Sequence, residues 1–196
     1  MFVMTLDQRG SRRDRDRVPD VLAVLSAREG VLRAFARTAG DEVQGVVGDA
    51  EVVVARGLDV LRSGGWSVGI GAGPVDDPMP DDVRAGSGPA FVLSRRAVER
   101  AKSRQRPVPV AVEGVRADLA RDAEAVLTLV AGIAARRTEG GWAAVDARRQ
   151  GGTQESVAAA LGVSQQAVSQ RLAAAMWQEE DAARPVVVRL LEGAQG

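Results

Sequence analysis

The sequence contains no cysteine, histidine or tyrosine, and Lys102 is its only lysine. The first two absences exclude disulfide frameworks, thiolate or imidazole metal sites, and catalytic arrangements in which histidine acts as the base. A single lysine leaves one position for a Schiff base or a P-loop, and no GxxxxGK[ST] motif surrounds Lys102. Any chemistry must therefore come from carboxylates, hydroxyl groups, arginine or the backbone, and we assign no catalytic residue.

Long hydrophobic runs are absent as well, since no apolar stretch reaches the roughly 20 residues that span a bilayer. No basic region precedes the apolar segment 2–6, so we expect no secretory signal. Hydrophobic residues make up 45% of the 196 positions and charged residues 27%, which is ordinary globular usage. We expect a cytoplasmic protein of one or two domains without a membrane partner.

The formal net charge is zero, but the charges are unevenly distributed along the chain. An N-terminal arm is rich in arginine and a middle segment is rich in aspartate. The arm holds Arg9, Arg12, Arg13, Arg15 and Arg17, and the middle segment holds Asp76, Asp77, Asp81 and Asp82. Such runs are typical of solvated loops, although a basic arm also suits a phosphate-bearing partner.

Hydrophobic periodicity divides the first 113 residues into alternating strand and helix patterns. Strands are predicted at 1–6, 31–38, 43–47, 66–72 and 108–112, and helices at 18–25, 51–61 and 89–102. The order β-α-β-β-α-β, followed by one more helix and strand, is typical of a ferredoxin-like α+β sheet. We expect helices on one face of that sheet.

From residue 118 onward the pattern is helical throughout, with predicted helices at 119–137 and 142–149. The composition changes at Glu113–Gly114, which predicts a boundary between an α+β domain at 1–113 and an all-α domain at 114–196.

Residues 153–175 read TQESVAAALGVSQQAVSQRLAAA. This segment resembles the helix-turn-helix of bacterial repressors and of sigma-factor region 4 domains. Val157 and Leu161 match the apolar positions of the first helix, and Gly162 supplies the positive φ that the turn requires. Ser164 matches the residue that caps the second helix.

The exposed face of the second helix carries uncharged polar groups and one arginine. Glutamine can bond bidentately to adenine, serine to several acceptors, and arginine to guanine or to phosphate. The predicted DNA-contacting residues are Ser164, Gln165, Gln166, Ser169, Gln170 and Arg171. The alternative is an αα-hairpin that only packs on its neighbours.

Carboxylates gather at one predicted edge of the sheet. Asp7 follows the first strand, and Asp41 with Glu42 lies in the turn Ala39–Glu42 between the next two strands. Grouped carboxylate oxygens suit Mg²⁺, so these three residues are candidate metal ligands. Alternatively, Gly40 and Asp41 only form the turn and Asp7 only caps a loop.

Four blocks, LDQRGSRR, TAGDEVQG, WSVGIGAG and GPAFVLSRR, together resemble the SatD family and, more distantly, the core of class III nucleotidyl cyclases. The resemblance spans residues 2–102. It implies that Asp7 and Asp41 hold Mg²⁺ against a nucleotide, and that Arg95 occupies the position of a cyclase arginine. Phe91 stands where cyclases carry asparagine, which argues against catalysis. Arg9 and Arg12 are further candidate ligand-binding residues.

The glycines of the segment Gly69–Gly73 alternate in a G-x-G-x-G pattern. This pattern allows two interpretations. In the first interpretation the glycines let the backbone approach a phosphate, and in the second they let the strand pack closely under a helix.

These observations together predict a DNA-binding transcriptional regulator whose N-terminal domain senses a small-molecule or nucleotide effector or mediates assembly. The alternative is a metal-dependent enzyme that binds or converts a nucleotide and dimerises through its C-terminal helices. One short helix with few cations binds DNA weakly, so we expect a homodimer. The expected seam is the apolar face of 119–133, together with Trp177 and the segment 186–191 after Pro185, which cannot continue a helix unkinked. The alternative is that the apolar face of 119–133 forms core within its own chain.

Overall fold

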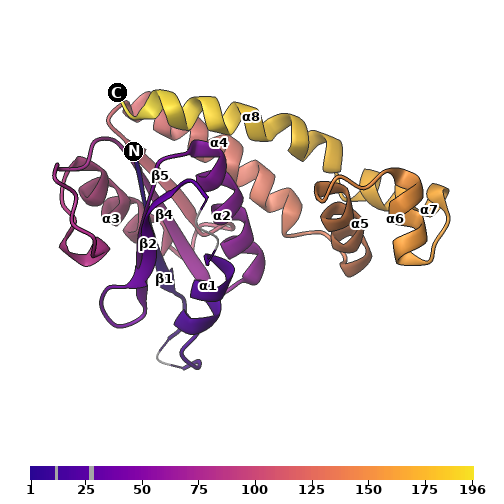
Figure 1. Ribbon diagram of the computed structural model, residues 1–196, viewed down its shortest axis with the longest axis horizontal. Coiled ribbons are helices and arrows are strands. Elements are labelled where there is room, and N and C mark those ends of the chain that lie inside the picture. The colour runs from indigo at the N-terminus through magenta and orange to yellow at the C-terminus, as the bar shows by residue number, and fades with distance from the viewer. Residues whose placement is uncertain (12, 27–28) are drawn as a thin grey trace.

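The computed structural model describes residues 1–11, 13–26 and 29–196. It contains a five-stranded sheet and eight α-helices within those ranges, so the α+β prediction is confirmed (Figure 1). The elements follow in the order β1 (Phe2–Gln8), α1 (Val18–Val24), β2 (Val31–Arg37), β3 (Glu42–Val47), α2 (Ala50–Ser63), β4 (Trp66–Ala72), η1 (Val83–Ala85), α3 (Pro89–Ala101), β5 (Val110–Gly114), α4 (Ala117–Ala134), α5 (Glu139–Arg149), α6 (Gln154–Leu161), α7 (Gln165–Ala174) and α8 (Trp177–Ala194).

The strands lie in the order β2-β3-β1-β4-β5, with β1 at the centre. Strand β1 is antiparallel to both β3 and β4, strand β2 is antiparallel to β3, and β5 is parallel to β4. The β2–β3 turn uses Gly40 at a φ of 59°, the left-handed conformation that glycine adopts without strain. In this register Asp7 pairs with Glu42 on one side and with Ser67 on the other.

Helices cover both faces of the sheet, which corrects the expectation of helices on one face. Phe2, Met4 and Leu6 pack against α1, α2, α4 and α8, whereas α3 contacts β1, β4 and β5 from the opposite side. Two glycines of β4 make this possible. A Cβ at Gly69 would lie 2.3 Å from the backbone nitrogen of Val98, and one at Gly71 would lie 2.2 Å from the carbonyl oxygen of Ala90. The alternating glycines therefore bring a helix close to the sheet.

This close approach makes Gly71 intolerant of any side chain. We expect Gly71→Ala to lower the free energy of unfolding by about 1–3 kcal/mol, because the new methyl group meets backbone atoms of α3 that cannot move independently. Gly57→Ala is the matched control. Its Cβ would have only Met4 Cε nearby, at 3.9 Å, so we expect a neutral effect or a gain of up to about 1 kcal/mol. Chemical denaturation of the two variants measures both values, and equal midpoints would refute the packing argument.

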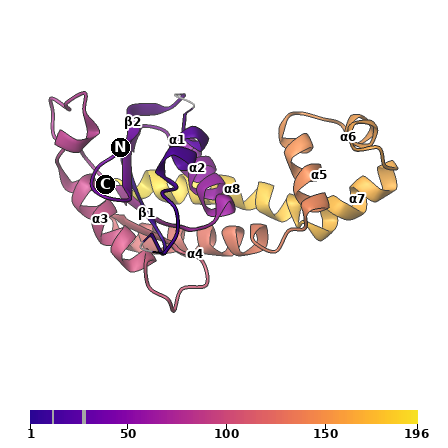
Figure 2. The same ribbon diagram turned by 90° about the horizontal axis from the view of Figure 1, so that it is seen from below.

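Helices α4 and α8 run side by side from the sheet to a small group formed by α5, α6 and α7, here called the head (Figure 2). The main hydrophobic core includes Leu127 of α4 and Leu191 of α8 together with the sheet. A separate cluster within the head contains Val145, Val157 and Val168. Packing therefore joins α4 and much of α8 to the sheet, although the composition of the sequence changes at Glu113–Gly114.

Helix α8 continues through Pro185. A proline inside a helix costs about 3 kcal/mol. Burial of Val187 and Leu191 against the main core offsets that cost. Leu127 is fully buried within its own chain, as the intrachain alternative for 119–133 expects, whereas Leu129 on the same helix is 68% exposed.

None of the helices in the described ranges combines the length and apolar character needed to cross a membrane.

Candidate functional site

Helices α6 and α7 form a tightly capped pair joined by a short turn. Thr153 Oγ1 accepts a hydrogen bond from the amide of Ser156 at 3.1 Å, and Ser164 Oγ accepts one from the amide of Ala167 at 3.1 Å. Gly162 ends α6 at φ 63° and ψ 34°, a left-handed conformation in which a side chain would be strained. These local signals define where both helices begin and where the first one ends.

One side of the α6–α7 pair is buried, and the polar side of α7 is therefore exposed to solvent. Val157 and Val168 are buried within the head, where Leu161 and Val163 also pack. The exposed residues are Ser164, Gln165, Gln166, Ser169 and Gln170. All of the predicted DNA-contacting residues except Arg171 are therefore exposed, and they share the free side of one helix.

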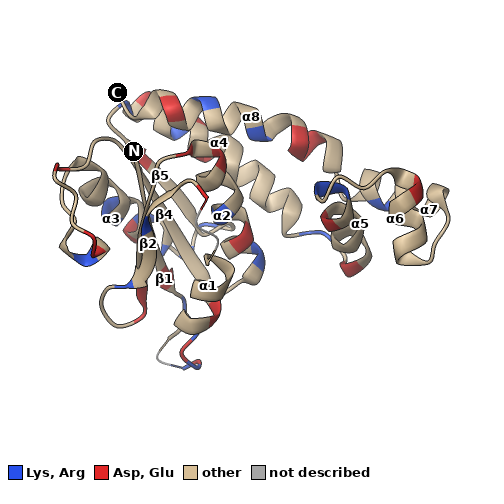
Figure 3. Cartoon of the chain, viewed as in Figure 1, with Lys and Arg blue, Asp and Glu red and all other residues tan. Residues whose placement is uncertain are grey.

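Arg171 is the single charged residue of α7, which Figure 3 shows almost without charge. Its guanidinium group lies against the first turn of α5, since a Cβ at Gly140 would be 3.5 Å from Arg171 Nε. Arg136 is exposed nearby, at the C-terminal end of α4. The cations around α7 thus come mainly from residues outside the helix.

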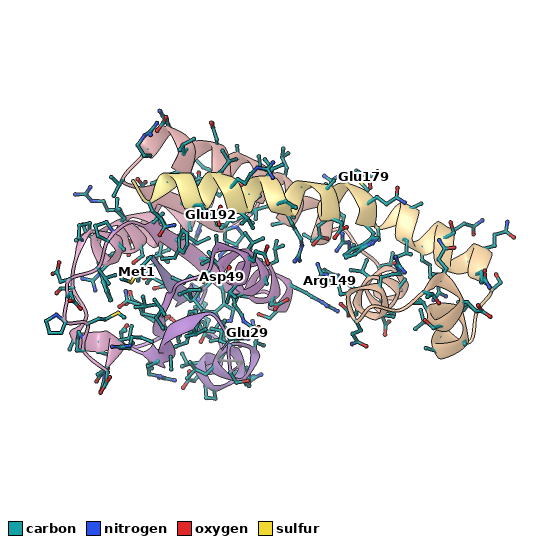
Figure 4. All side chains as sticks on the ribbon, turned by 45° about the horizontal axis from the view of Figure 1, so that its top comes forward. Met1, Glu29, Asp49, Arg149, Glu179 and Glu192 are labelled. Atoms are coloured by element: carbon teal, nitrogen blue, oxygen red, sulfur yellow. The ribbon has the colours of Figure 1, made fainter. Side chains whose placement is uncertain are left out.

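A buried charge cluster joins the head to α8. Glu180 has no exposed side-chain surface, and its carboxylate pairs with Arg137, Arg149 and Arg184. Figure 4 labels Arg149 at this junction and Glu179 on the outer side of α8. Burial raises the pKa of Glu180, but the three arginines outweigh this effect and hold the pKa below its ordinary value.

A second contact ties the head directly to the sheet region. The two terminal guanidinium nitrogens of Arg62, on α2, each donate to one carboxylate oxygen of Asp146, on α5, at 2.8 Å. The same guanidinium lies 3.8 Å from the ring centroid of Trp142, an attractive cation–π arrangement. The orientation of α7 is therefore defined relative to the rest of the molecule.

The candidate metal ligands lie around the end of β1. Asp7 and Glu42 are register partners on adjacent strands and share the face that α3 covers. Glu42 Oε1 accepts a hydrogen bond from Thr38 Oγ1 at 2.7 Å, and Asp41 lies in the turn before β3. Over the described part of the chain, no three acidic side chains gather closely enough to hold a metal ion. The magnesium assignment stays a prediction.

Lys102 is the residue that sequence reasoning missed at this site. Its ammonium group lies 2.8 Å from the Asp7 carboxylate and 2.7 Å from Glu99. Burial raises the pKa of Asp7 despite this cation, while the two carboxylates outweigh burial and raise the pKa of Lys102. No local motif marks the pairing, because 95 positions separate the two residues in the sequence.

The predicted ligand-binding arginines do not all come together. Arg9 lines a pocket of about 490 Å³ with Asp7, Ser67 and Lys102. Arg95 is exposed on α3 and does not line that pocket, and Arg12 lies outside the described residues. Phe91, at the position of the cyclase asparagine, packs closely over Gly86.

Comparison with models of protein families, with curated proteins and with solved structures finds no match to this chain.

Proposed function

We propose that the protein is a DNA-binding transcriptional regulator and that α6 and α7 form its helix-turn-helix. The observation that carries this proposal is the free side of α7, where Gln165, Gln166, Ser169 and Gln170 are exposed together on a helix held by its buried side. Amide and hydroxyl groups of this kind bond to base edges in the major groove. The proposed partner is double-stranded DNA.

The sheet region is proposed to be a ferredoxin-like domain that senses an effector or mediates assembly. The strand order β4-β1-β3-β2 with antiparallel neighbours supports this assignment. Its resemblance to the SatD family and to cyclase cores agrees with a small-molecule or nucleotide effector. The hydrogen bond between Arg62 and Asp146 connects the sheet region directly to the head.

A homodimer completes the proposal. Each α7 contributes one arginine, and affinity for DNA depends on how many phosphates are neutralised. Two copies related by a two-fold axis would double the cations and would contact half-sites one or more helical turns apart.

Replacing the polar side chains of α7 tests the proposal. We expect Gln166→Ala and Gln170→Ala each to cost about 1–3 kcal/mol of discrimination between cognate and unrelated duplexes, because a bidentate base contact is lost. Gln178→Ala, at an exposed position on α8, is the control and should change nothing. Selection from genomic fragments followed by fluorescence anisotropy measures the effect. Failure of the unaltered protein to enrich any sequence would contradict the proposal.

A further inference from the structure

A pocket of about 290 Å³ lies between the start of α5 and the flank of α7. Its wall contains three arginines, the N-cap residue of α5, and further residues of α5 and α7. The residues that matter here are Arg136, Arg137, Thr138, Gly141, Gln170 and Arg171, and we call this site the arginine pocket. No aspartate or glutamate lines it, and although Glu180 neutralises Arg137, the guanidinium groups of Arg136 and Arg171 give the pocket a positive charge.

The first turn of α5 adds to this positive character. Thr138 is the N-cap of the helix, and its hydroxyl accepts a hydrogen bond from the amide of Gly141 at 3.1 Å. The first amides of an α-helix have no partner within the helix, and the helix dipole favours an anion at this end. The pocket therefore combines cationic side chains with a helix N-terminus.

Arg137, the third arginine, is committed to contacts within the protein. Its side chain is 1% exposed, Nε donates to the carbonyl oxygen of Ala175 at 2.9 Å, and Nη2 pairs with Glu180. Nη1 is buried without a hydrogen-bond acceptor among the described residues, and the guanidinium carbon lies 4.9 Å from the ring centroid of Trp142. Because Nη1 has no accessible surface, the cationic groups that a ligand in the pocket can reach are those of Arg136 and Arg171.

We propose that the arginine pocket holds one backbone phosphate of the DNA duplex. This inference rests on the proposed function, because the pocket shares Gln170 and Arg171 with the face of α7 that would contact the bases. A phosphodiester carries one negative charge and two non-bridging oxygens, which match the arginine donors. The lining residues of α7, Ala167, Gln170 and Ala174, lie on one flank of that helix, so the phosphate would sit at the edge of the groove.

Two substitutions in the full-length protein test the pocket. We expect Arg136→Ala to weaken binding to all duplexes by about tenfold and to reduce the slope of log K against log salt by about one, without altering sequence preference. Ala174→Glu places a carboxylate at the pocket and should weaken binding further. The matched controls are Arg189→Ala and Ala182→Glu, both at exposed positions of α8. An unchanged salt slope, or losses equal to those of the controls, would overturn the proposal.

A titration of the free protein separates this proposal from the proposed function. Inorganic phosphate, added at constant ionic strength against chloride, should shift the NMR signals of the Gly140 and Gly141 amides and of the Arg136 and Arg171 side chains. Ala174→Glu should abolish these shifts. If they occur but no duplex binds, the pocket is an anion site and the DNA function is wrong. If duplexes bind but phosphate shifts none of these signals, the DNA function stands and the pocket proposal is wrong.

Discussion

Glu180→Gln is expected to lower the free energy of unfolding by about 3–5 kcal/mol, because it removes the charge that balances a buried cation. The glutamate side chain is 0% exposed and that of Arg137 is 1% exposed, so neither group can regain water without opening the junction. Arg149 and Arg184 would also lose the carboxylate on which they converge. The expected loss is a large share of the stability of a domain of this size.

Glu179→Gln is the matched control, since it makes the same change at the neighbouring exposed position of α8 and should cost little. Denaturant unfolding, followed by the fluorescence of Trp66 in β4, Trp142 in the head and Trp177 at the start of α8, measures both variants. Equal unfolding midpoints for Glu180→Gln and Glu179→Gln would show that the cluster contributes no net stability.

The same cluster predicts how stability depends on pH. The folded-state pKa of Glu180 lies below its ordinary value, so the folded protein binds fewer protons there than the unfolded chain. The contribution of Glu180 is then fully present above the ordinary glutamate pKa and is lost as the pH falls through the folded-state pKa. Glu180→Gln should flatten the acid side of the stability profile, whereas Glu179→Gln should leave its shape unchanged.

Leu127→Asp is expected to prevent stable folding rather than to separate a dimer. Leu127 is 0% exposed and belongs to the core that α4 shares with the sheet. Loss of a buried leucine side chain alone costs about 2–5 kcal/mol, and an unpaired carboxylate in the same place adds a further penalty. Circular dichroism and thermal unfolding should show a loss of cooperative structure.

Leu129→Asp is the informative counterpart, because Leu129 lies two residues further along α4 and is 68% exposed. The chain should fold normally with this substitution, so any change in mass by light scattering would report on association through that side of α4. A folded, cooperative Leu127→Asp variant would contradict the packing of α4 against the sheet.

Most helices and strands were predictable because their signals are local. The apolar run at 2–6 and the turn at Ala39–Glu42 locate β1 and the β2–β3 hairpin with small shifts at their ends. Ser164, predicted as a capping residue, marks the start of α7 in the structure, and Thr153, where the helix-turn-helix segment begins, caps α6. Helix α8 continues through Pro185, because burial of its neighbours on α8 outweighs a lost backbone hydrogen bond.

The sites were predictable only in part. The polar face of α7 follows from the helical period, so its residues could be named in advance. The pairing of Asp7 with Lys102 and the convergence of three arginines on Glu180 join distant positions, and no spacing rule connects them. The arginine pocket likewise combines residues of α7 with the segment around Thr138, a contact that depends on the packing of α5 on α7.

The sequence by itself determined the α+β class, the absence of cysteine and histidine chemistry, and the uncharged face of α7, because composition and short-range periodicity specify each of them. The tertiary structure decided where these parts lie. Glycines at 69 and 71 bring α3 onto the second face of the sheet, and burial of Leu127 and Leu191 joins α4 and α8 to the same core. Such choices depend on close packing and on charge pairing between residues far apart in the chain, which a one-dimensional pattern does not contain.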